Sequence, residues 1–214
     1  MPKEMNSTGI SVGWTISGVP SPQSIIDAAA AGMVSRQDLC YEEFSKDINQ
    51  EKAEEFLRKM IQWGHESVLE HIVFQFWVSI SRVASHQLVR HRMASYTQMS
   101  LRKQRELTVE SFVIPWQIKL EDLDEWISDI RHTIEIYNKW LEKGYGPDVA
   151  RRKLTQETRT DVVITINARS LRNFFALRMA HDADFEIREM AERMHKLIEE
   201  KSLGFLFEDI GFGK

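Results

Sequence analysis

Arginines and short polar side chains alternate in residues 90–102, which read RHRMASYTQMSLR. The surrounding window, from His71 to Arg105, contains no aspartate or glutamate, although the whole chain has 32 acidic residues and a net charge of −4. A guanidinium group donates hydrogen bonds in a fixed fork, and a serine hydroxyl adds a short donor, so this composition favours phosphate oxygens. The stretch therefore predicts an anion site. Charge alone leaves a solvated basic loop open as the alternative.

The composition of the chain indicates its class. At 214 residues, with 43% hydrophobic and 28% charged residues, it is predicted to be a globular protein with one domain spanning residues 1–214. The negative net charge argues against a general nucleic-acid coat. A single cysteine, Cys40, excludes an internal disulfide framework and fits a reducing cytosol. With neither a signal-peptide core nor a run of about 18 apolar residues, we expect a cytoplasmic protein without a membrane span.

The elements that must position the basic stretch follow from hydrophobic periodicity. Alternating apolar and polar residues predict a strand over residues 74–80, and Ser81 is suited to cap a helix after it. Helices are predicted over residues 23–31, 51–63 (ended by Gly64), 82–92, 121–143, 168–180 and 183–201, with a short one carrying Arg151; further strands are predicted over 108–114 and 162–166, and a loop or irregular turn over 94–100. Strands and helices that do not alternate regularly predict an α+β fold rather than a doubly wound sheet.

Several common catalytic motifs are absent from the sequence. The ten glycines form neither G-x-G-x-x-G nor a phosphate loop, which excludes a dinucleotide fingerprint and a Walker site. His65 and His71 are six residues apart, whereas a zinc-binding H-E-x-x-H helix needs a spacing of four, so we expect no metal. Cys40 lies far from the basic stretch and has no adjacent histidine, which predicts a small buried hydrophobe rather than a nucleophile.

Three segments, taken together, resemble the sequence blocks of the flavin-dependent thymidylate synthases. The first is residues 90–102, with the pattern R-H-R, seven spacer residues and S-x-R. The second is HESVLEH at residues 65–71, and the third is NARSLRNFF at residues 167–175, followed by Arg178 and by Glu186-Ile187. Their order and separations match over about residues 20–200.

This resemblance implies a fold and a reaction. The fold would be α+β, with a mostly antiparallel sheet flanked by helices. The enzyme would be a homotetramer that binds FAD and dUMP where subunits meet, with no nucleic-acid partner. NADPH would reduce FAD, and 5,10-methylenetetrahydrofolate would supply the carbon that reaches C5 of the uracil, giving dTMP and tetrahydrofolate. No enzyme cysteine would attack the pyrimidine.

The resemblance also implies roles for particular residues. Arg178 would be catalytic, because a guanidinium that faces the pyrimidine favours ionisation at N3 and raises the electron density at C5. The residues implied to bind dUMP are Gln87, Arg90, Gln98, Met99, Ser100, Leu101, Arg102, Arg151 and Arg178, with Ser100 and Arg102 on the phosphate. Those implied to bind FAD are His65, Ser67, Arg90, His91, Arg92, Gln98, Asn167, Arg169 and Asn173.

Helical geometry gives the third block an independent check. Asn167 and Arg178 are eleven residues apart and share one face of a helix, whereas Arg169 and Asn173 share a different face. Two polar stripes on one helix permit contact with two ligands or with two subunits. A surface helix with Asn167 as its cap and solvated arginines is the alternative.

The chain departs from the family pattern at several positions. Asp182 stands four residues after Arg178, where some members have a histidine that contacts the flavin, and His181 comes one residue early. Gln98 stands where some members have glutamate, which keeps hydrogen-bonding capacity but removes a charge. Lys103 stands where an aromatic residue is common, next to the folate side of the pocket.

Two other functions are compatible with the basic stretch. A nucleotide- or RNA-binding protein would use the cluster from Arg82 to Arg105 without catalysis, but it would not need Asn167, Arg169 or Asn173. A flavin enzyme that acts on a different nucleotide would keep all three blocks, and competition against dUMP would distinguish it.

Overall fold

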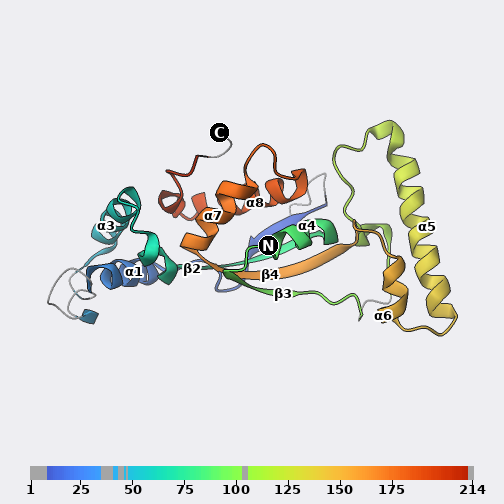
Figure 1. Cartoon of the computed structure of the whole chain (residues 1–214), viewed down its shortest axis with the longest axis horizontal. Coiled ribbons are helices and arrows are strands. Elements are labelled where there is room, and N and C mark those ends of the chain that lie inside the picture. The colour runs from blue at the N-terminus through green and yellow to red at the C-terminus, as the bar shows by residue number, and fades with distance from the viewer. Residues whose placement is uncertain (1–8, 35–40, 43–45, 47, 103–105, 212–214) are drawn as a thin grey trace. The chain divides into compact units, whose positions relative to one another are not determined.

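The computed structural model describes residues 9–34, 41–42, 46, 48–102 and 106–211, and its fold is α+β (Figure 1). An antiparallel sheet has the strand order β1-β2-β4-β3, formed by β1 (Ser11–Trp14), β2 (Val73–Ser81), β3 (Ala94–Gln98) and β4 (Arg159–Asn167). The α-helices are α1 (Pro22–Val34), α3 (Gln50–Gln62), α4 (Arg82–Leu88), α5 (Leu123–Glu142), α6 (Pro147–Ala150), α7 (Ala168–Arg178) and α8 (Phe185–Glu199). Short 3-10 helices are η1 (Glu66–His71), η2 (Val109–Ser111), η3 (Leu120–Asp122), η4 (Arg151–Lys153) and η5 (Gly204–Leu206). The predicted fold class is confirmed.

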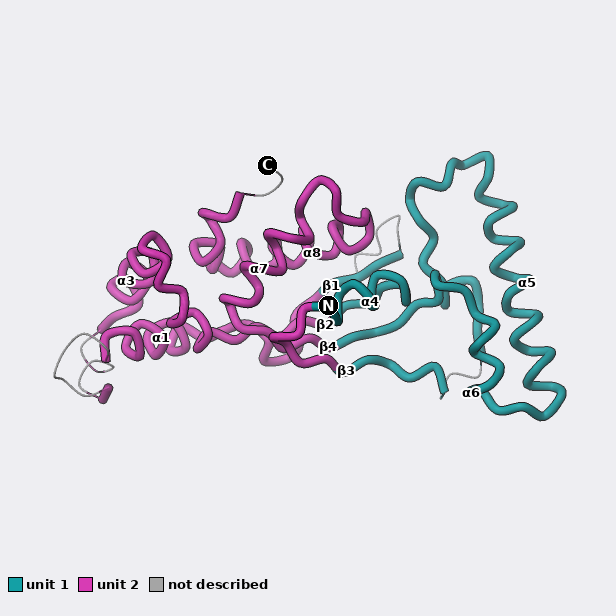
Figure 2. Tube along the Cα trace, in the orientation of Figure 1, with its two compact units in different colours: residues 1–12, 78–90, 97–162 teal, residues 13–77, 91–96, 163–214 magenta. Residues whose placement is uncertain are grey.

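The chain divides into two compact units (Figure 2). Unit 1 comprises residues 1–12, 78–90 and 97–162, and unit 2 comprises residues 13–77, 91–96 and 163–214. The boundary crosses β2 and β4, and it also separates Arg90 from His91 within the basic stretch. That residues 1–214 behave as one domain stays a prediction.

Unit 2 is built around aromatic side chains from distant parts of the chain. Phe74 and Phe76 of β2 are fully buried, and Trp14 of β1 stacks on both, with ring centroids 6.2 and 4.5 Å away. Phe207 packs edge-on against Phe74 and against Phe175 of α7. Because each such ring removes a large apolar area from water, this cluster provides much of the stability of the unit.

Unit 1 joins the end of β2 to a helical segment. Ser81 caps α4 as predicted, since its side chain accepts a hydrogen bond from the backbone N–H of Ala84 at 3.1 Å. Further along the chain, the buried Tyr137 of α5 forms a second core together with Leu107 and Ala150, and Ile134, Trp140, Leu141 and Leu154 pack against it. None of the helices in the described part of the chain is both long and apolar enough to cross a lipid bilayer.

Most predicted elements are confirmed, but three segments differ. Residues 94–100 were predicted to be a loop, yet 94–98 form β3, the last strand in the order; its polar residues hide the strand pattern. Residues 108–114 form η2 and a single bridge from Phe112 to Thr158, because Thr108 and Ser111 cap each other in a 3-10 turn. The helix predicted over 82–92 ends at Leu88, so Arg90 lies in the tight turn that follows. Strand β1 had no counterpart among the predicted elements.

Three helices end with the same backbone turn. After α3, the N–H of Gly64 bonds to the carbonyl of Ile61 and that of His65 to Met60, which is a Schellman motif with Gly64 at φ 74°. Gly144, at φ 85°, ends α5 in the same way. Ser202 occupies the equivalent position after α8, at φ 59°. A Cβ is unfavourable in this left-handed conformation, so Ser202 is strained where Gly64 and Gly144 are not.

Replacing Ser202 with glycine should therefore stabilise the protein. We expect Ser202→Gly to raise the free energy of unfolding by about 0.5–1 kcal/mol, because the relieved strain exceeds the added freedom of the unfolded chain. Gly64→Ser is the matched reverse change and should lower it by a similar amount. Urea denaturation followed by circular dichroism measures both. A lower midpoint for Ser202→Gly would contradict the assignment of strain.

Candidate functional site

Unit 1 contains a basic cavity of about 280 Å³. It is lined by side chains of α4, η4 and the segments next to η4 and β4: Arg82, His86, Leu101, Arg151, Arg152, Leu154, Thr155, Gln156 and Thr158. Three of these residues are arginines and none is acidic. Two residues implied by sequence to bind dUMP, Leu101 and Arg151, are among them. The chemistry of the lining suits an anion, as the sequence predicts for this region.

The stretch from Gln98 to Arg102 leads into this cavity. The backbone N–H of Met99 bonds to the carbonyl of Asp161 at 2.8 Å, which fixes the chain just before Ser100. Leu101 is buried, whereas Ser100 and Arg102 are exposed, and the N–H of Arg102 bonds weakly to the Ser100 hydroxyl at 3.4 Å. Two of the predicted phosphate contacts, Ser100 and Arg102, are therefore adjacent and accessible to a ligand.

The side-chain amide of Gln98 forms hydrogen bonds with two neighbouring hydroxyl groups. Its Nε2 donates to the Ser85 hydroxyl at 3.0 Å and to that of Thr160 at 3.2 Å. Ser85 donates its hydroxyl proton to the carbonyl of Arg82, so its oxygen acts as the acceptor of a hydrogen bond from residue 98. A glutamate could not donate that bond. The replacement of glutamate by Gln98, noted in the sequence, thus agrees with its surroundings.

In unit 2 the predicted catalytic arginine contacts the basic stretch. The Nε of Arg178, at the end of α7, donates to Nε2 of His91 at 2.9 Å, across 87 positions of sequence. The His91 ring also packs edge-on against the buried Phe174, with centroids 4.9 Å apart. Burial, and next the positive charge of Arg178, lower the pKa of His91 from 6.5 to about 4. The imidazole is therefore neutral near pH 7, and its Nε2 accepts the hydrogen bond that Nε of Arg178 donates.

Tyr96 supports this arrangement and was not predicted from sequence. Its hydroxyl donates to the backbone carbonyl of His91 at 2.8 Å, which closes the turn between His91 and β3 within the basic stretch. Burial raises the pKa of Tyr96 to about 12, so the hydroxyl keeps its proton at neutral pH. A tyrosine in a polar strand gave no sequence pattern from which this role could be inferred.

Arg172 forms a buried ion cluster that the sequence also did not reveal. Its side chain is only 7% exposed. Its guanidinium donates to Glu66 of η1 at 3.0 Å, to both carboxylate oxygens of Asp209 at 2.8 and 2.6 Å, and to the carbonyl of Leu206. Hydrogen bonding by Arg172 lowers the pKa of Asp209. The cluster fastens α7 to η1 and to the segment after η5.

The remaining predicted flavin contacts of unit 2 lie on η1, on α7 and in the basic stretch. Asn167 caps α7 by accepting from the N–H of Ser170 at 2.8 Å, and Arg169 pairs with Glu70 at 2.6 Å. Exposed polar side chains in this group are His65, Ser67, Arg92, Arg169 and Asn173. Leu171 and Phe174 of α7 are buried, whereas Arg169 and Asn173 are exposed on another face of the helix. That the polar stripes of α7 contact two ligands or two subunits stays a prediction. Lys103 and Cys40 lie outside the described residues, and both His181 and Asp182 are exposed.

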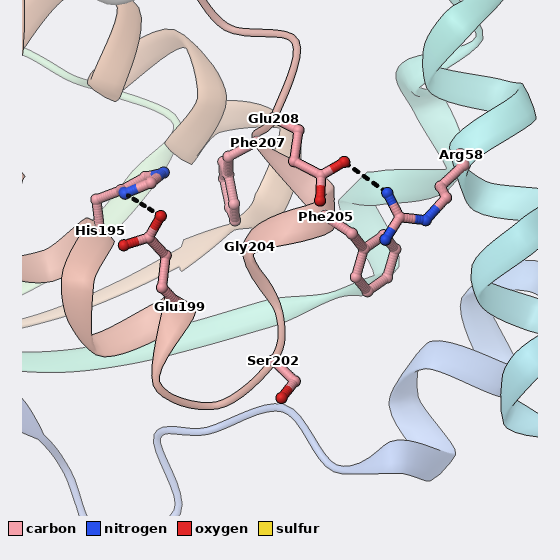
Figure 3. Close-up of a pocket in the computed structure, with 8 residues that line it drawn as sticks. All are labelled: Arg58, His195, Glu199, Ser202, Gly204, Phe205, Phe207 and Glu208. Atoms are coloured by element: carbon pink, nitrogen blue, oxygen red, sulfur yellow. Dashed lines mark hydrogen bonds and ion pairs between the residues drawn. The ribbon is translucent and has the colours of Figure 1, made fainter.

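Unit 2 has a cavity of its own, of about 450 Å³ (Figure 3). Phe205 and Phe207 form apolar walls, and Arg58 at the rim pairs with Glu208 at 2.6 Å while its guanidinium lies over the Phe205 ring. His195 lies 3.6 Å from Glu199, and burial lowers its pKa. The predicted site residues do not line this cavity, and its one arginine already has a carboxylate partner.

Comparison with known proteins extends these observations. The family model described as Thymidylate synthase complementing protein matches residues 16–202. The flavin-dependent thymidylate synthase of Pyrococcus abyssi is 41% identical over 170 residues, covering 77% of this chain and 70% of that protein. The enzyme of the same name from Clostridium tetani is 34% identical over 203 residues, covering 82% and 77%. The fold is similar to that of the UMP/dUMP methylase PolB from Streptomyces cacaoi bound with 5-Br dUMP, at a TM-score of 0.77 and 21% identity, covering 95% and 97% of the two chains.

The contact between His91 and Arg178 predicts an acid-shifted titration. Ring signals of His91, followed by NMR, should titrate near pH 4. In Arg178→Ala the pKa should rise but stay below 6.5, because burial, the larger cause, remains. Unfolded His91 takes up a proton near pH 6.5 and folded His91 near 4, so the native state loses stability as the pH falls between these values. A His91 pKa near 6.5 in the wild type would contradict the contact.

Proposed function

This chain belongs to the thymidylate synthase complementing protein family, and from that membership we propose that it converts dUMP to dTMP by FAD-dependent reductive methylation. The carbon donor is 5,10-methylenetetrahydrofolate and the reductant is NADPH. The observation that carries the proposal is the match to the family over residues 16–202. The contact between Arg178 and His91 supports it, because it joins the basic stretch to the third sequence block.

In the proposed enzyme, unit 1 supplies the contacts to dUMP from Gln87, Arg90 and residues 98–102. Ser100 and Arg102 hold the phosphate with a hydroxyl and a guanidinium, and Arg151 adds a second guanidinium from the basic cavity. Both Ser100 and Arg102 are exposed, as such contacts require. Phosphate binding at this end fixes the orientation of the nucleotide.

Arg178 is the proposed catalytic residue. Its guanidinium stays protonated throughout, so it stabilises negative charge that develops on the pyrimidine as N3 ionises, and electron density at C5 increases. His91 holds Nε of Arg178 at 2.9 Å and, being neutral, adds no competing charge beside it. A donor whose position is fixed before the reaction needs little reorganisation when the charge appears.

Unit 2 contains donors that suit FAD. Exposed side chains of η1 and α7 include His65, Arg169 and Asn173, and Arg92 follows in the basic stretch. These side chains offer cationic and neutral donors to a pyrophosphate and to ring carbonyls, without a glycine-rich motif. When bound, FAD accepts a hydride from NADPH and returns the reducing equivalent to the pyrimidine. The chain's own part is to bind and orient the two ligands.

The proposed function also implies an oligomeric state and a cellular location. We propose a homotetramer in which subunits meet at the active sites, in the cytoplasm, with no cysteine nucleophile. Sedimentation analysis measures the state directly.

The activity can be tested with purified protein. We expect visible flavin absorbance that NADPH bleaches, and release of tritium from C5-labelled dUMP when NADPH, FAD and methylenetetrahydrofolate are all present. Omission of NADPH or methylenetetrahydrofolate, or prior removal of the bound FAD, should stop the release. A protein that neither binds FAD nor consumes NADPH would rule out the proposed function.

Arg178→Ala should abolish most turnover while the fold persists. Loss of one preorganised donor to developing charge costs about 10²- to 10³-fold in kcat, so a reduction of at least that size is expected. Arg188→Ala is the matched control, because Arg188 is a partly exposed arginine of the same unit that bonds the carbonyl of His181 and lies near Glu192. Near-normal rates for Arg178→Ala would show that its assigned role is wrong.

A further inference from the structure

The arginines of this chain differ in whether a carboxylate balances them. Five form ion pairs: Arg58 with Glu208, Arg169 with Glu70, Arg172 with Glu66 and Asp209, Arg188 with Glu192, and Arg193 with Glu189. Within residues 9–34, 41–42, 46, 48–102 and 106–211, no carboxylate pairs with Arg82, Arg151 or Arg152. The arginines without carboxylate partners in this part of the chain thus include the three that line the cavity of unit 1.

The cavity brings these three charges together. Arg82 comes from the first turn of α4, and Arg151 and Arg152 come from η4. Like charges around one cavity repel, and the repulsion is relieved when an anion binds between them. Thr155 and Gln156 add neutral polar groups to the wall. Glu157, although adjacent in sequence, does not line the cavity.

Backbone hydrogen bonds fix the two sides of the cavity to each other. The backbone N–H of Arg82 donates to the carbonyl of Thr158 at 2.9 Å, and the backbone N–H of Val83 donates to the carbonyl of Gln156 at 3.2 Å. The Thr158 hydroxyl donates to the carbonyl of Thr155 at 2.7 Å, which holds the intervening turn. The backbone of the walls is therefore fixed before a ligand arrives, so binding loses little backbone conformational entropy.

We propose that Arg82 and Arg152, together with Arg151, bind the dianion of a phosphate monoester. Arg82 and Arg152 are not among the residues that the sequence resemblance assigns to any ligand. The proposal rests in part on the proposed function, which supplies two such groups: the 5′-phosphate of dUMP and the 2′-phosphate of NADPH. A cavity with several guanidinium groups and no carboxylate suits either group, because a dianion accepts several charge-assisted hydrogen bonds at once.

The test uses the double variant Arg82→Gln/Arg152→Gln in the full chain. Binding of inorganic phosphate, measured by calorimetry, should weaken about 10- to 100-fold, as expected when charge-assisted hydrogen bonds are lost. Arg131→Gln is the matched control, because Arg131 is an exposed arginine of α5 in the same unit that does not line the cavity. The control should bind phosphate as the wild type does.

Kinetics of the holoenzyme then identify the source of the phosphate. If the site takes the 2′-phosphate, the double variant loses its preference for NADPH over NADH and keeps its affinity for dUMP, whose phosphate is then held by Ser100 and Arg102 without Arg151. If it takes the 5′-phosphate, the affinity for dUMP falls and the preference for NADPH remains. Either result supports the proposal.

The proposal is overturned if phosphate binding, dUMP affinity and NADPH preference are all unchanged in the double variant, or if Arg131→Gln has the same effect. Phosphate binding is measured without turnover, so its loss in the double variant would support the site even if the protein failed to make dTMP. Failure of the site and failure of the proposed function therefore give different results.

Discussion

A buried guanidinium needs hydrogen-bonded partners for its charge. In unit 2, the partners of Arg172 determine which segments are held together. Glu66, Asp209 and the carbonyl of Leu206 come from three parts of the chain. Leaving such a charge without partners would cost several kcal/mol, so η1, α7 and the segment after η5 stay together. Helices η1 and α7, together with their N-cap residues His65 and Asn167, carry five of the nine side chains proposed to contact the flavin. The positions of those five side chains therefore depend on the ion cluster of Arg172, which joins η1 to α7.

Local patterns in the sequence were sufficient to predict most of the fold. The cap formed by Ser81, the stop at Gly64 and the periodicity of α5 act over a few residues, and each was predicted correctly. Strand β3 was missed because its pairing, rather than an apolar alternation, makes it a strand. The site was predicted only in part for a similar reason: Arg178 and His91 are 87 positions apart, and Arg172 and Asp209 are 37 apart. Contacts of this kind have no local pattern.

The acid-free window from His71 to Arg105 supplies only part of the lining of the basic cavity in unit 1. Arg82 belongs to that window, but the cavity is completed by Arg151 and Arg152, whose segment is joined to α4 through backbone bonds. Another part of the window has a different use, since His91 positions Arg178 as a neutral acceptor. The acid-free window thus contributes the charge of Arg82 to unit 1 and the uncharged ring of His91 to unit 2.

The three arginines that line the cavity of unit 1, which pair with no carboxylate among the described residues, also affect how ligands reach the protein. The net charge of −4 repels an approaching dianion at long range, whereas the cavity, with three arginines and no acidic residue in its lining, attracts it. Such contrast raises the rate of productive encounter, and the gain shrinks as ions screen the field over about 10 Å at 0.1 M salt. The arrangement therefore acts on the speed of capture as well as on affinity, which makes ionic strength a determinant of how quickly this protein is loaded.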